Sequence, residues 1–335
     1  MGADSEVADA LAFYFWPARW VGSPPSNDAE GDRLDDVIFE SSLPRDLRMK
    51  VCRDGMVVWD FTAWGGNPSL RRHYGKGGRI DPEPDIKAQI RCLRLMNAHL
   101  ACLFQSLPNS LESIQVLTPN HFLKVRFSNC EWLTGNHDDP NGYLLGLARK
   151  RPETLDPRWR LSRLVLGIEG LEGADGLLRQ LLERESSEMA LFRIESIYRS
   201  LVAFRSFDHG GVLVNAWVAI EGLLGDLFAR YLDTEHKGNG ENRIDSDRRR
   251  YLEGSSLNSR TTAEILSLVG LLPYRLYREV RTCAKARNSW MHSAAPGAMG
   301  SAQAEQAIRV ASEMFRLVEG VDFSPPITRH LMSFG

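Results

Sequence analysis

The sequence predicts two parts of different fold class: an α+β domain over residues 1–155 and an all-α helical bundle over residues 156–335. In the first part, short apolar runs alternate with Gly, Pro and Asp turns, which is typical of strands. From Arg158 onward, apolar residues recur at the spacing of α-helices. The length of 335 residues also exceeds that of one average domain. Two domains are therefore expected.

The first part contains one predicted helix and two predicted pairs of strands. An Asp-Gly turn separates apolar runs at 49–52 and 56–61, which predicts a β-hairpin. A Thr-Pro-Asn turn separates a second pair of predicted strands at 113–117 and 121–127. Between the two pairs, apolar residues at helical spacing predict a helix over 85–106. The role of this domain, sensory or regulatory, is a hypothesis only.

The second part consists of long helical periods. Turn residues and prolines place its start within 135–160. The polar segment 233–260 is expected to be a solvated, mobile loop. The periodic apolar residues predict helices at 158–183, 187–206, 211–232, 261–270, 273–292 and 302–319.

Composition excludes several classes of protein. The 41 basic and 43 acidic residues give a net charge of -2, so nucleic-acid binding requires a local basic face. The five cysteines form no CxxC pair, which argues against a disulfide framework and a structural zinc site. No apolar run approaches 18 residues and no basic secretory leader is visible. A cytoplasmic protein without a membrane span is expected.

Two charged residues lie on apolar lines of predicted helices. Glu221 lies within about 20° of the line through Val214 and Phe228, so its carboxylate is expected to face the interior. Arg287 continues the apolar line of the helix 273–292. Because a buried carboxylate requires a cation and guanidinium pairs with it in a bidentate way, the two are expected to meet. A purely structural salt bridge is the alternative interpretation.

Arg287 is followed directly by Asn288 and, five positions on, by His292. Five helical steps rotate a side chain by roughly 140°, so Arg287 and His292 do not share a face of an unbroken helix. The two side chains meet only if the helix unravels at Ser293, or if two copies of the helix end converge in a dimer.

The order of these features resembles the HEPN superfamily, in particular its Apea-like branch, whose hallmark is Arg-x4-6-His with a polar residue after the Arg. The resemblance covers roughly 190–320 and includes the run Ala216–Glu221. It implies a HEPN-like bundle that acts, without metal or cofactor, as an endoribonuclease at a composite site in a homodimer. It also implies that tRNA or another cellular RNA is cut, in antiphage defence or as a toxin, under an unknown trigger such as a ligand or a phage protein.

The resemblance assigns a role to each candidate residue. His292 would be the general base or acid, Arg287 would hold the scissile phosphate, and Asn288 would orient the phosphate or His292. Glu221 would hold Arg287 in place. Further RNA contacts are expected from basic residues nearby, although a run of arginines is more often a solvated surface: Arg281, Lys285, Arg248, Arg249 and Arg250.

Alternative interpretations remain open. A non-catalytic helical module that binds a nucleotide, an RNA or a protein partner would also fit. The run Gly75–Arg79, within the Gly- and Pro-rich connection 65–84, lacks the form of a phosphate-binding loop. The run His137–Asp139 carries metal-ligand side chains, but a turn explains them and no second cluster completes a site, so no metal is expected. The aromatic residues of the first part are more often core than a stacking surface.

Overall fold

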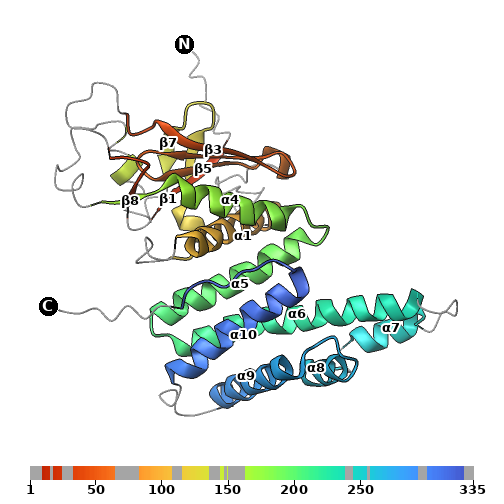
Figure 1. Cartoon of the computed structure of the whole chain (residues 1–335). Coiled ribbons are helices and arrows are strands. Elements are labelled where there is room, and N and C mark those ends of the chain that lie inside the picture. Colours follow the sequence, from red (N-terminus) through yellow and green to blue (C-terminus); the bar gives the residue numbers. More distant parts are fainter. Residues whose placement is uncertain are drawn as a thin grey trace, which may run out of the picture. The chain divides into compact units, whose positions relative to one another are not determined.

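The chain divides into two compact units, residues 1–187 and 188–335. The computed structural model (Figure 1) has a β-sheet region followed by a helical region, which confirms the predicted order of an α+β part and a helical part. Helices α1 (Glu83–Ser106) and α4 (Ile168–Leu182) belong to the first unit, although the sequence placed the second of them in the bundle. The structure describes residues 10–15, 18–24, 33–64, 83–107, 115–135, 144–146, 149, 163–237, 244–254, 257–292 and 300–327.

Six strands of the first unit form an antiparallel sheet in the order β3-β4-β5-β1-β6-β7. The predicted hairpin is confirmed as β4 and β5, with Gly55 at φ +86° in its turn, where residues other than glycine are strained. The predicted strand at 121–127 is confirmed as β6. The bounds are β1 Ala10–Tyr14, β3 Val37–Leu43, β4 Leu47–Cys52, β5 Met56–Asp60, β6 Leu123–Arg126 and β7 Glu131–Gly135.

Helices α1 and α4 cover the same face of this sheet. Ser41 is paired with Met49, and Met49 with Trp59, so the three side chains point to one face. On that face the Trp59 ring contacts His99 of α1, and the Ser41 hydroxyl donates to Asp175 of α4. Figure 1 shows the two helices side by side against the sheet. The predicted helix at 85–106 is confirmed.

Two sequence predictions in the first unit are wrong in part. Residues 164–166, expected to be helical, form strand β8 (Leu164–Leu166), which pairs in parallel with β2 (Arg19–Val21). A short apolar run is compatible with a buried strand as well as with a helix. Here the pairing with β2 makes it a strand. Residues 115–117 form no strand, because the Asn97 side chain satisfies the N–H of Leu117 at 2.8 Å and its carbonyl at 3.3 Å.

The second unit is helical, and five predicted helices are confirmed. An additional helix, α7, interrupts the segment that was expected to be a mobile loop. Its N-cap is Asp245, whose carboxylate accepts a hydrogen bond from the N–H of Arg248 at 2.7 Å. The helix was not predicted because the whole segment is polar. The helices are α5 Ser187–Arg205, α6 His209–Lys237, α7 Ser246–Glu253, α8 Ser259–Leu268, α9 Tyr274–His292 and α10 Ser301–Glu319.

Helix α6 is the central helix of this unit, since it packs against α8, α9 and α10. Its segment His209–Thr234 reaches a mean hydropathy of 1.6 and is long and apolar enough to span a membrane. Half of that apolar stretch is buried inside the protein, as in the core helix of a soluble bundle. Length and composition alone thus do not distinguish a membrane-spanning helix from the core helix of a bundle.

Candidate active site

Helix α9 carries the candidate residues and is fixed by one apolar stripe. Leu276, Tyr277, Val280 and Cys283 are buried against α6, α8 and α10. Burial raises the pKa of the Cys283 thiol to about 12, so this side chain stays neutral inside the bundle. The stripe leaves the opposite face of α9 in solvent.

The last turns of α9 present the three motif residues to solvent. Asn288 and His292 are exposed and Arg287 is half-buried. The Nη1 atom of Arg287 donates to Oδ1 of Asn288 at 2.9 Å. Within the described part of the chain, no carboxylate pairs with this guanidinium. Arg287 is therefore available to an external anion.

Arg287 and His292 do not meet within one chain. The helix remains intact through His292, so the two side chains leave it roughly 140° apart. The expected unravelling would begin at Ser293, which lies outside the described residues. The described residues therefore test neither of the two routes that the sequence left open.

A contact with α6 fixes the end of α9. The ring of Trp290 lies against Gly210, where a Cβ atom would collide with it. Asp208 caps the start of α6, because its Oδ1 atom accepts from the N–H of Gly211 at 2.9 Å. This contact was not predicted from the sequence, where its local signal is only a pair of glycines near a capping aspartate. It holds the motif against the first turn of α6.

The prediction that Glu221 faces the interior is wrong. Its side chain is exposed, and its Oε1 atom accepts a hydrogen bond from the Ser259 hydroxyl of α8. Val214 and Val218, on the same line of α6, are also 37% and 38% exposed. Helix α6 is apolar on most sides. The helical spacing therefore placed Glu221 correctly on one line with Val214 and Val218, but it did not show which face of the helix is buried. The expected pair with Arg287 is not formed among the described residues.

The basic residues proposed to bind RNA are placed unequally. Arg281 donates to the Tyr277 hydroxyl at 3.0 Å and lies over its ring, and that hydroxyl in turn donates to Glu264. These contacts hold the Arg281 guanidinium at the junction of α8 and α9. It is therefore less available to an RNA phosphate than an exposed side chain would be. Lys285, by contrast, is exposed on α9.

The three arginines of α7 form a surface that is largely neutralised. Arg249 pairs with Asp233 at 2.6 Å and with Glu253 at 2.8 Å. Arg250 lies 3.9 Å from Asp247 in a pair that is almost fully exposed. Arg248 is exposed. This distribution fits the solvated-surface interpretation better than a continuous track for RNA.

The described residues contain no group of three His, Cys, Asp or Glu side chains that could hold a metal ion. The two further motifs weighed in the sequence, Gly75–Arg79 and His137–Asp139, lie outside the described residues. No family model, curated protein or solved structure matches the chain. The candidate site is thus defined by the residues of α9 and their neighbours.

Proposed function

We propose that the protein is a metal-independent endoribonuclease whose site is formed by the ends of α9 from two copies of the chain. The supporting observation is that Arg287, Asn288 and His292 lie on the last turns of one ordered helix, reach solvent and lack a neutralising carboxylate among the described residues. The structural salt bridge with Glu221, on which a non-catalytic role for Arg287 depended, is not formed there.

The chemistry requires little more than these groups. RNA supplies its own nucleophile, because the 2′-hydroxyl can attack the adjacent phosphorus once a base removes its proton. Imidazole exchanges protons near neutral pH, so His292 of one copy would accept that proton and its counterpart would donate one to the leaving 5′-oxygen. Arg287 would bind the phosphate oxygens as negative charge grows on them. The products would be a 2′,3′-cyclic phosphate and a 5′-hydroxyl.

Asn288 would position the guanidinium. Its Oδ1 atom accepts from Arg287, which restricts the rotation of the long side chain before a phosphate arrives. A preorganised donor loses less conformational freedom on binding. Lys285, exposed on the same helix, would contact a neighbouring phosphate.

The direct test is cleavage of RNA. Purified protein is incubated with tRNA and with total RNA in EDTA, and 2′,3′-cyclic phosphate ends are quantified. We expect His292→Ala and Arg287→Ala each to lower the cleavage rate by about 100-fold, the loss typical of a missing general base or phosphate ligand. Arg278→Ala, which removes an exposed arginine from the same helix, is the matched control and should cleave like the wild type. Equal cleavage by all variants, or none by the wild type with cell extract added as a source of trigger, would support the binding-module alternative.

The dimer has its own test, because an apolar surface adjoins the motif. Val214 and Val218 are exposed one turn apart on α6, near the turn that contacts Trp290. We expect sedimentation to report a dimer, and Val218→Glu to yield a monomer that has also lost cleavage, since a charge in an apolar interface is costly. Leu268→Glu, at an 80% exposed residue of α8, is the control and should stay dimeric. A monomeric wild type that cuts RNA would contradict the composite site.

The wider biological setting rests on the resemblance alone. Cleavage of tRNA or other cellular RNA would arrest growth, which suits a toxin or an antiphage defence protein in the cytoplasm. A trigger would then be required to control the activity.

A further inference from the structure

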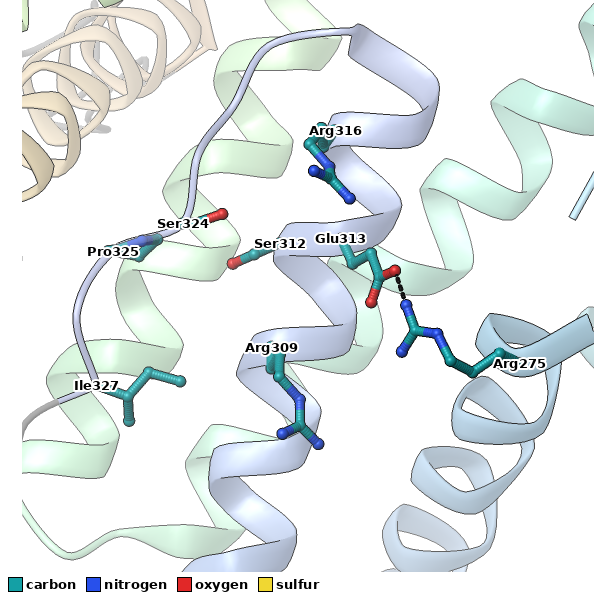
Figure 2. A pocket seen from close by; sticks show the side chains of 8 residues that line it. All are labelled: Arg275, Arg309, Ser312, Glu313, Arg316, Ser324, Pro325 and Ile327. Carbon is teal, nitrogen blue, oxygen red and sulfur yellow. Dashed lines mark hydrogen bonds and ion pairs between the residues drawn. The ribbon is translucent and has the colours of Figure 1, made fainter. Parts of the chain in front are cut away.

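A hollow on the second unit is lined by arginines that the proposed ribonuclease site does not use. It has a volume of about 340 Å³, within the range of small-molecule sites. Its walls come from the first turn of α9, one face of α10 and the chain that follows α10 (Figure 2). The lining residues are Arg275, Arg309, Ser312, Glu313, Arg316, Ser324, Pro325 and Ile327.

Two of the arginines are available to a ligand. Arg309 and Arg316 are exposed and lie seven residues apart on α10, hence on one face and about 10 Å apart along its axis. Neither pairs with a carboxylate within the part of the chain that the structure describes. Figure 2 shows them on either side of Glu313.

The acidic residue between them is already neutralised by a third arginine. Glu313 accepts from Arg275 of α9, and Arg275 also bonds Glu279 at 2.9 Å. Among the lining residues, three guanidiniums face one carboxylate, that of Glu313, while the carboxylates of Glu279 and Asp322 contact lining residues without being part of the lining. The same ion pairs hold Arg275 away from the two open guanidiniums.

The rest of the hollow offers hydroxyl groups and an apolar wall. Ser312, only 5% exposed, points from α10 toward the chain that carries Ser324 (Figure 2). The Ser324 hydroxyl donates to Asp322 at 2.8 Å, so it presents its oxygen and not a free proton. Pro325 and Ile327 complete the wall with apolar surface. Guanidiniums beside an apolar wall suit a phosphate group that carries an organic part.

We propose that this hollow binds a phosphate-bearing small molecule, with Arg309 and Arg316 as the phosphate ligands. Guanidinium groups form charge-assisted hydrogen bonds with phosphate oxygens. The spacing of the two arginines suits a diphosphate or triphosphate better than a single phosphate. Arg275 lies about 18 Å from Arg287 along α9, so the site is separate from the motif and does not depend on the proposed function.

The experiment measures binding to the full chain by calorimetry with three probes: ATP, inorganic pyrophosphate and a short single-stranded RNA. We expect ATP or pyrophosphate to bind, and Arg309→Gln and Arg316→Gln each to weaken that binding by about tenfold. Stronger binding of ATP would identify a nucleotide as the source of the phosphate, whereas stronger binding of pyrophosphate would identify the free anion.

The control is Arg278→Gln, which removes an exposed arginine of α9 that does not line the hollow. It should bind both probes like the wild type, and circular dichroism should show that all three variants are folded. The proposal is overturned if neither small probe binds at millimolar concentration, if only the RNA binds, or if the double variant Arg309→Gln/Arg316→Gln binds as tightly as the control.

Discussion

Replacing Arg149 by methionine is expected to lower the unfolding free energy of the first unit by about 3–5 kcal/mol. Arg149 forms a bidentate pair with Asp54, at 2.6 Å from Nε and 2.7 Å from Nη2, and both side chains are at most 5% exposed. Its Nη1 atom also donates to the carbonyl of Cys130 at 2.7 Å. Without the guanidinium, the carboxylate would remain buried and, among the described residues, would keep the Tyr14 hydroxyl and the N–H of Met56 as its hydrogen-bond donors.

Urea denaturation of the full chain measures this effect, provided that the transition of the first unit is resolved from that of the second. Arg126→Met is the matched control, because Arg126 pairs with Glu131 at 2.8 Å in a bridge whose side chains are each 36% exposed. An exposed pair contributes about 0–1 kcal/mol. Similar losses in the two variants would contradict the assigned importance of the buried pair. The double variant Asp54→Asn/Arg149→Met should recover part of the stability, since no unpaired charge remains.

The first unit is also expected to lose roughly 3 kcal/mol of unfolding free energy between pH 6.5 and pH 4 through His99 alone. Burial lowers the pKa of this fully enclosed imidazole to about 4, although the charge of the nearby Asp175 acts in the opposite direction. Neither ring nitrogen has a hydrogen-bond partner among the described residues. The unfolded chain binds the proton below pH 6.5 and the native chain only near pH 4, so acid favours unfolding throughout that interval.

Denaturation at a series of pH values separates this contribution from that of the carboxylates. His99→Phe keeps an aromatic ring beside Trp59, whose ring centre lies 5.4 Å from that of the imidazole, and it removes the titrating group. Its stability should fall less steeply between pH 6.5 and 4 than that of the wild type. His121→Phe, at a half-buried histidine with a backbone partner, should keep the original slope. Identical slopes in the wild type and His99→Phe would disprove the prediction.

Five helices of the second unit were predictable because their apolar residues recur at the helical period, whereas α7, which has no buried residue, was not predicted. Strands of the first unit were harder to predict. All five residues of β1 are buried, so no alternation between apolar and polar side chains marks it. Strands β2 and β8 are three residues each, and they exist because they pair with one another across the length of the unit. The local sequence pattern does not show that such a distant partner strand exists.

The same distinction applies to the candidate site. The spacing of Arg287, Asn288 and His292 can be read directly from the sequence, and the helix that carries them was predicted from its apolar periodicity. The contact between Trp290 and Gly210 joins two helices far apart in the chain and was not foreseen. The orientation of Glu221 was predicted wrongly because an apolar helix offers several lines that could face the core.

The order of strands in the sheet bears on how the chain is made. Strand β1 is synthesised early, yet it lies between β5 and β6, and β2 finds its partner only in β8. On a ribosome, the nascent first unit would expose apolar strand edges until residues near 166 have left the exit tunnel. The first unit can therefore complete its folding only after about half of the 335 residues have been synthesised, and an early-stalled fragment would be a natural target for chaperones and proteases.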